Sequence, residues 1–170
     1  MVSIADFSCV GFSGSRSLAG VSRAALSVAA SSVSPSASVL VGCAGGVDKF
    51  FRSQFPCARV FSASSFGIGR GAFARRSVAV VSAVASAGGC WVSFPSSACP
   101  AGLVPSASSS RCFSGSGSGS WASLAFALGS GVACFVCLPA GVPAPAGWGL
   151  SSVGGGWFVS SPVPAQLSLF

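Results

Sequence analysis

Five short apolar segments recur along the chain, and their pattern constrains the fold more than any other feature. Each is continuously apolar rather than alternating, which is typical of strands buried on both faces of a parallel sheet. We expect strands over residues 7–12, 39–43, 58–62, 90–94 and 132–138. The stretches between them are compatible with helices, expected over residues 17–32, 47–54, 69–87 and 121–128. This order predicts an α/β fold, a parallel sheet with helices on both faces.

The remaining segments are connections. Residues 95–112 form a loop with three prolines, residues 140–156 are rich in Pro and Gly, and residues 157–160 are compatible with a last edge strand. A chain of 170 residues is long enough for one domain with a sizeable core. We assign residues 1–160 to this domain and residues 161–170 to a Pro-containing linker and tail.

The charged residues favour binding over catalysis. The chain has no Glu, His, Tyr, Asn or Thr, and its only acids are Asp6 and Asp48. All five missing residue types need adenine in every codon, so an adenine-poor coding strand explains their absence. Without His, a Ser–His or Cys–His nucleophile pair cannot form, and acid–base chemistry would depend on an aspartate alone. We therefore expect hydrolysis to be absent and the protein not to be an enzyme.

A net charge of +7 favours an anionic partner such as nucleic acid or a nucleotide phosphate. The alternative is that this charge only keeps an apolar protein in solution. The eight cysteines mostly lie in apolar runs, where Cys behaves as a small core residue. Cys134 and Cys137 form a lone CxxC whose sulfurs a strand would point to opposite faces, so we expect no zinc site. Without a signal peptide or an unbroken apolar span of about 20 residues, we expect a cytoplasmic protein with no membrane contact.

Three glycine-rich turns are the candidate ligand site. Gly14-Ser15-Arg16 follows the first expected strand and opens the first helix, residues 42–48 follow the second strand, and residues 115–120 precede the helix at 121–128. The carboxyl ends of parallel strands lie at one edge of the sheet, where helix N-termini favour phosphate groups. Arg75 and Arg76 could add charge. Two alternatives remain: the Gly-Ser run is a flexible linker, and Asp48 only stabilises its own turn or helix dipole.

These turns resemble a known family. Gly-Ser-Arg after the first strand, Gly-x-Ala-x-Gly-x-Asp after the second, an Arg pair in the long helix and a late Gly-Ser-Gly-Ser turn are similar to the SLOG superfamily of Rossmann-like proteins. The nearest branch is DNA-processing protein A, which loads recombinase onto single-stranded DNA. The resemblance implies a Rossmann-like fold and a pocket for nucleotide or DNA phosphate. The implied pocket residues are Gly14, Ser15, Arg16, Gly42, Gly45, Asp48, Arg75, Arg76, Gly117 and Ser118.

The chain departs from this family at two points. The nucleotide phosphoribohydrolases of the superfamily use a glutamate near a Gly-Gly-Thr turn, and this chain has no Glu. The branch that binds single strands keeps an Asn after its arginine, where this chain has Arg76 and Ser77. Bases could still stack on aromatic rings along an arginine-lined groove. Phe66, Phe73 and Phe113 are candidates for this role, and the alternative for each is a place in the core.

The last five residues resemble another known motif. Gln166-Leu167-Ser168-Leu169-Phe170 is similar to the pentapeptide by which bacterial proteins dock on the DNA-polymerase sliding clamp. In that interpretation Leu169 and Phe170 enter an apolar pocket of the clamp and Gln166 makes polar contacts at its rim. The alternative is a C-terminal strand that packs on the protein's own sheet.

Three functions are consistent with these observations. The first is a non-enzymatic DNA-binding protein, tethered to the sliding clamp, that acts on single-stranded DNA in replication, recombination or repair of a bacterial genome, plasmid or phage. The second is a nucleotide sensor or nucleotide-processing enzyme of the SLOG superfamily. The third is a self-assembling structural protein, because low charge and an apolar, Gly/Ser-rich surface favour homo-oligomers. The only cofactor suggested is a bound nucleotide.

Overall fold

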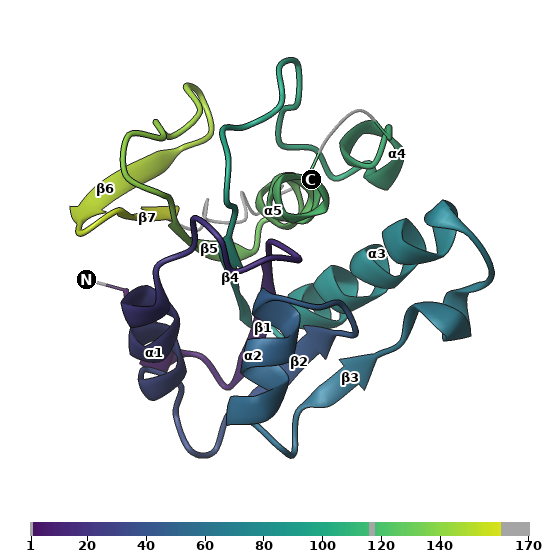
Figure 1. Cartoon of the computed structure of the whole chain (residues 1–170), viewed down its shortest axis with the longest axis horizontal. Coiled ribbons are helices and arrows are strands. Elements are labelled where there is room, and N and C mark those ends of the chain that lie inside the picture. The colour runs from purple at the N-terminus through teal and green to yellow at the C-terminus, as the bar shows by residue number, and fades with distance from the viewer. Residues whose placement is uncertain (1, 116–117, 161–170) are drawn as a thin grey trace, which may run out of the picture.

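A seven-stranded sheet with the order β3-β2-β1-β4-β5-β7-β6 forms the centre of the domain (Figure 1). The computed structural model describes residues 2–115 and 118–160. Strands β1 to β5 pair in parallel, whereas β7 is antiparallel to both of its neighbours, β5 and β6. The strands are β1 (Cys9–Gly14), β2 (Ser38–Gly42), β3 (Arg59–Phe61), β4 (Cys90–Phe94), β5 (Ala133–Cys137), β6 (Leu150–Gly154) and β7 (Trp157–Ser160). The predicted Rossmann-like α/β fold is therefore confirmed, with an antiparallel hairpin added at one edge.

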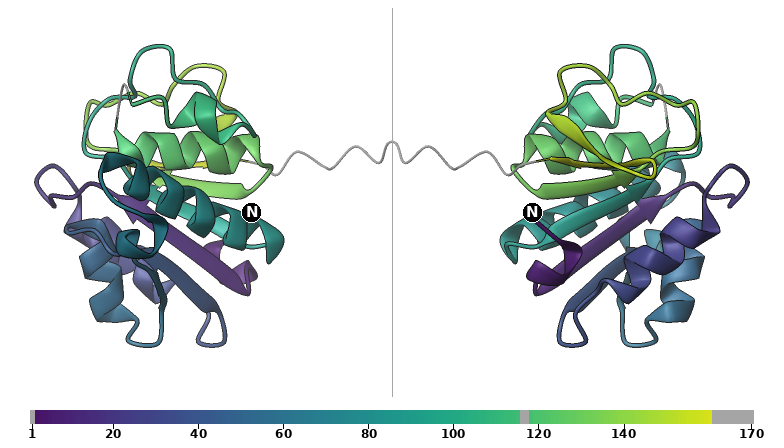
Figure 2. Two further views of the ribbon diagram at one scale, coloured as in Figure 1. Left: turned by 90° about the vertical axis from the view of Figure 1, so that its right-hand side faces the viewer. Right: turned by 90° about the vertical axis from the view of Figure 1, so that its left-hand side faces the viewer.

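Helices cover both faces of the sheet. The 3-10 helices are η1 (Ile4–Asp6) and η2 (Ala63–Phe66). The α-helices are α1 (Arg23–Ser31), α2 (Val47–Gln54), α3 (Arg70–Ser86), α4 (Ser109–Cys112) and α5 (Gly119–Gly129). The left view of Figure 2 looks onto α3, and the right view looks onto α1 and the β6–β7 hairpin. The molecule thus has three layers, with the sheet between two layers of helices.

Each face of the sheet has its own core because side chains alternate along a strand. On one face, Val10 and Phe12 of β1 pack with Leu26 of α1 and Phe51 of α2. On the other face, Trp91 of β4 packs with side chains of α3 and α5. The five named side chains are all at most 1% exposed. Burial on both faces explains the apolar runs of β1, β2, β4 and β5, whereas the edge strand β3 is mostly exposed and begins with Arg59.

The first helix begins later than the sequence indicates. We expected it over residues 17–32, opened directly by Gly14-Ser15-Arg16, but α1 begins at Arg23. The serines in between form local turns instead, since Ser15 Oγ accepts the N–H of Ser17 and Ser17 Oγ accepts the N–H of Ala19. Such side-chain hydrogen bonds compete with helix formation. Helix α1 therefore starts only after its N-cap residue Ser22, whose Oγ accepts the Ala25 N–H at 3.2 Å.

The predicted last edge strand is not at the edge. Residues 157–160 form β7, which lies between β5 and β6, and β6 is the edge strand. Gly155 and Gly156 form the hairpin turn that connects the two strands, and both have positive φ, as does Gly154 at the end of β6. Most of β6 is exposed, and its sequence carries no apolar run, which is why it reads as part of a Pro/Gly-rich connection.

Two smaller expectations concern cysteines and membranes. Cys134 joins the core under α3 and α5, and Cys137 joins the core under α1 and α2, so the CxxC sulfurs lie on opposite faces as predicted. The loop at 95–112 ends in the short helix α4, which the sequence did not predict. In the described part of the chain, none of the helices combines the length and the apolar character needed to cross a membrane.

Candidate functional site

A cleft of about 210 Å³ opens at the carboxyl ends of β1 and β4. These two strands are neighbours at the centre of the sheet, and the chain leaves β1 toward β2 and β3 before it returns to β4. This is the switch point of the topology, the usual ligand site of an open α/β sheet. The first residues of α5 and the N-terminal halves of α2 and α3 complete the walls.

Most of the predicted site residues come together here. The cleft is lined by Gly14, Ser15, Arg16, Gly42, Asp48, Arg76 and Ser118. Gly45 lies beside them, since a Cβ on it would be 3.3 Å from the Arg16 carbonyl oxygen. Arg75 lies elsewhere, with its Nε donating to the carbonyl of Phe66 at 2.7 Å. The predicted Gly117 lies outside the described residues, as do the five tail residues from Gln166 to Phe170.

Asp48 and Arg76 form the charged floor of the cleft. Both are buried, with 4% and 9% of their surfaces exposed, and Arg76 Nη1 lies 3.7 Å from Asp48 Oδ2. The same carboxylate oxygen accepts the N–H of Ala44 at 3.1 Å, so Asp48 does stabilise its own turn. Burial raises the pKa of the Asp48 carboxyl, although the Arg76 charge and the Ala44 hydrogen bond partly oppose this shift.

Residue 42 must be a glycine because it lies directly against Asp48 and Arg76. A Cβ at residue 42 would lie 2.5 Å from Asp48 Oδ2 and 2.8 Å from Arg76 Cζ, too close for either group to keep its place. Arg52 Nη1 donates to the Gly42 carbonyl at 2.7 Å and fixes the end of β2 from the other side. The glycine is therefore required by close approach, and its position holds Asp48 and Arg76 together.

Arg16 lines the cleft and lies against Phe73, which does not itself line it. The Arg16 guanidinium lies over the Phe73 ring, with Cζ 4.7 Å from the ring centre, and Arg76 Cζ lies 5.8 Å from the same centre. Phe73 is 38% exposed, so its ring is partly open to a ligand while it holds both cations. Phe66 and Phe113, the other stacking candidates, pack against the core in part.

Two buried N–H groups among the lining residues lack an acceptor. Within residues 2–115 and 118–160, Arg76 Nε and Trp91 Nε1 have no hydrogen-bond partner, and both residues line the cleft. An unpaired buried donor costs free energy. Both atoms have almost no accessible surface, so a ligand in the cleft would lie near these two groups rather than directly against them. By contrast, the other fully buried indole, that of Trp121, donates to the carbonyl of Ser97 at 2.9 Å.

The start of α5 adds further donors. Ser118 is the N-cap residue, but its hydroxyl does not bond the backbone of the first turn and lies 2.7 Å from Ser120 Oγ instead. The first N–H groups of a helix have no partner within the helix, and the positive end of the dipole lies with them. Hydroxyls, helix N–H groups and guanidinium groups thus surround one recess.

Several residues of the cleft escaped sequence reasoning. Ser77, Trp91 and Ser96 line it from segments outside the three predicted glycine-rich turns. Cys43 lies directly behind it: its sulfur accepts the Ala63 N–H at 3.2 Å and Arg76 Nη1 at 3.5 Å. Burial raises the pKa of this thiol, but the two hydrogen bonds and the Arg76 charge lower it by more, so the pKa lies below its ordinary value.

The donor set suits an anion better than a cation. Asp48 is the only carboxylate among the described lining residues, and it already bonds Ala44 and Arg76. The described residues contain no group of three or more His, Cys, Asp or Glu side chains that could hold a metal ion. Comparison of the chain with protein-family models, curated proteins and solved structures gave no match. The assignment of the site therefore depends on its geometry.

Proposed function

We propose that the cleft binds the phosphate of a nucleotide unit in single-stranded DNA, and that the protein holds this DNA without cleaving it. The observation that carries the proposal is the lining of the cleft, which combines serine hydroxyls, the guanidinium groups of Arg16 and Arg76, and the N-terminus of α5. Phosphate oxygens accept hydrogen bonds without donating any, and they favour a helix N-terminus such as that of α5.

The charges support a nucleic-acid ligand. Arg16 is exposed at the mouth of the cleft, and the chain as a whole carries +7. Asp48 is tied to Arg76 and Ala44, so it is poorly placed to act as a general base. The resemblance of the glycine and arginine turns to the SLOG superfamily favours the same class of ligand.

Fluorescence anisotropy with a labelled oligothymidylate tests this proposal. Arg16→Met keeps the stem that packs near Phe73 but removes the charge, and Arg23→Met is the matched control because Arg23 is exposed at the start of α1. We expect Arg16→Met to weaken binding and to reduce the salt slope by about 1, as for one lost phosphate contact. Equal affinity and equal slope in the two variants would refute phosphate binding at the cleft.

We further propose that the tail recruits the protein to the DNA-polymerase sliding clamp. The support is the pentapeptide Gln166-Leu167-Ser168-Leu169-Phe170, which follows a linker with two prolines. A pull-down with purified clamp should retain the whole chain and lose a chain that ends at Ala165. A Leu169→Ala, Phe170→Ala double variant should behave like the truncated chain. If the whole and shortened chains bind equally, or neither binds, the tail is not a clamp motif.

A free nucleotide is the second candidate ligand. The polar cleft shares residues with an adjoining pocket that is largely apolar, and this pairing is typical of sites for small molecules. A nucleotide sensor would bind nucleoside monophosphates with affinities that are insensitive to chain length. Titration of mononucleotides against oligonucleotides separates the two candidates, and chromatography of the mixtures would reveal any turnover.

A further inference from the structure

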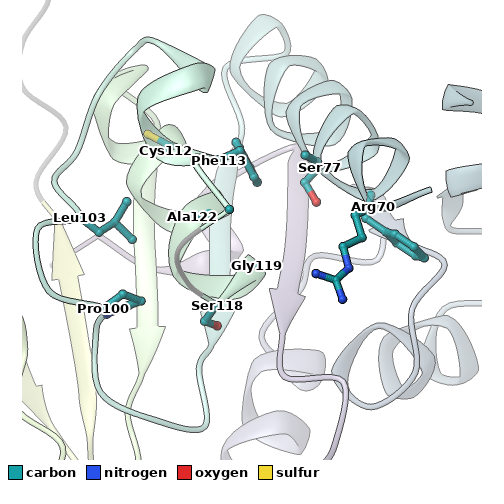
Figure 3. A pocket seen from close by; sticks show the side chains of 12 residues that line it. Arg70, Ser77, Pro100, Leu103, Cys112, Phe113, Ser118, Gly119 and Ala122 are labelled. Atoms are coloured by element: carbon teal, nitrogen blue, oxygen red, sulfur yellow. The ribbon is translucent and has the colours of Figure 1, made fainter. Parts of the chain in front are cut away.

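A second pocket of about 160 Å³ adjoins the cleft. Ser77, Ser118 and Gly119 line both recesses, so the two are direct neighbours. Figure 3 shows Leu103 and Pro100 on one side of the pocket, Ser77 and Arg70 of α3 on the other, and Ala122 of α5 between them. The loop that precedes α4 therefore closes the pocket on the side away from α3.

The two recesses differ in chemistry. The pocket walls are mainly apolar, and Cys112 and Phe113 form its far end. Phe73 lines this pocket, and its ring also carries the guanidinium of Arg16 at 4.7 Å. One aromatic ring thus separates the cations of the cleft from an apolar space that is open to the same ligand.

A ligand that fits both recesses has an anionic end and a flat apolar end joined by a short polar link. We infer that the pocket takes the base of the nucleotide unit whose phosphate occupies the cleft. This inference rests on the proposed function and adds to it a site for the base. A nucleotide has the required order of phosphate, sugar and ring, and aromatic walls such as Phe73 bind the face of a base.

The pocket does not select strongly among bases. Its described polar side chains are Arg70, Ser77, Ser118 and the thiol of Cys112. Among them only the guanidinium of Arg70 could read a base edge in two places, and the base that it would read is guanine. Stacking tolerates every base because each has a π-face. We therefore expect the adenine, cytosine and thymine nucleotides to bind with similar affinity, the guanine nucleotide to bind at least as tightly, and a nucleotide without its base to bind more weakly.

Isothermal titration calorimetry with thymidine 5′-monophosphate, 2-deoxyribose 5-phosphate and inorganic phosphate tests the inference. The base should improve affinity about 5- to 150-fold over the sugar phosphate, the increment typical of one stacked base. Ala122→Leu fills the pocket from α5 and should remove this increment while the affinity for deoxyribose phosphate stays unchanged. Ala24→Leu, on the exposed side of α1, is the control and should change neither.

The outcomes separate the two proposals. Equal affinity for the mononucleotide and the sugar phosphate, in the wild-type protein, would overturn the base pocket and leave phosphate binding intact. Failure of all three probes, and of a trithymidylate, would overturn both. A preference for trithymidylate over its abasic counterpart, without mononucleotide binding, would support the pocket and identify a DNA strand as the source of the base.

Discussion

Removal of the Arg76 charge should destabilise the protein in a strongly pH-dependent way. Arg76→Met keeps the packing of the alkyl stem but leaves the carboxyl of Asp48 buried without its cation. Since the folded protein already raises the pKa of Asp48, the loss of Arg76 raises it further. A carboxyl with a raised folded pKa binds protons more tightly when folded, so stability falls as the pH rises from 3.8 toward the folded pKa.

The size of the effect has an upper limit. The variant can always avoid a buried charge by keeping Asp48 protonated. Keeping a carboxyl with an ordinary pKa of 3.8 protonated at pH 7 costs about 4 kcal/mol, at about 1.36 kcal/mol for each pH unit. Part of this cost is already present in the wild type, because its pKa is raised too. We therefore expect Arg76→Met to lose about 1–3 kcal/mol more at pH 7 than at pH 4.

Urea unfolding at pH 4 and pH 7 measures this difference. Few other groups interfere, because the chain has no His and its only other side-chain acid, Asp6, is exposed in η1. Asp48→Asn combined with Arg76→Met should remove most of the pH dependence. Arg75→Met is the control, since it removes only an exposed hydrogen bond to Phe66. Equal destabilisation by Arg76→Met at both pH values would refute the reasoning.

Two further results follow from the same floor of the cleft. Gly42→Ala should cost about 1–3 kcal/mol in unfolding experiments because its Cβ collides with Asp48 and Arg76. Gly119→Ala should cost nothing, because a Cβ there meets no atom of the described residues within 4 Å. Alkylation of Cys43 by iodoacetamide, followed by mass spectrometry, should have a midpoint below the ordinary thiol pKa, and Arg76→Met should move it to higher pH; an unmoved midpoint would show that Arg76 does not activate the thiol.

Strands β1, β2, β4 and β5 were predictable because burial on both faces requires apolar runs, and the short strand β3 was found although most of it is exposed. The start of α1 was not predictable. The side chains of Ser15 and Ser17 accept hydrogen bonds from backbone N–H groups two residues later, and such bonds compete with helix formation. Strand β6 was missed because an exposed edge strand needs no apolar pattern.

The sequence predicted where the glycine-rich turns of the site lie, but it predicted less well which side chains reach the cleft. Arg75 and Arg76 are adjacent in sequence, yet only Arg76 reaches the cleft. Its position follows the buried face of α3, four residues after Ala72 and four before Val80, so helix periodicity could have separated the two arginines. The unpaired indole of Trp91 has no sequence signal, because its lack of an acceptor depends on three strands and two helices packing around it.

Nuclear magnetic resonance of the side-chain N–H groups tests the central claim most directly. In a ¹⁵N-labelled sample titrated with oligothymidylate, the resonances of Arg76 Nε and Trp91 Nε1 should shift strongly because both groups belong to residues that line the cleft. The indole of Trp121, already bonded to Ser97, should shift far less. If the oligonucleotide binds and neither Arg76 nor Trp91 responds, the DNA does not bind in this cleft.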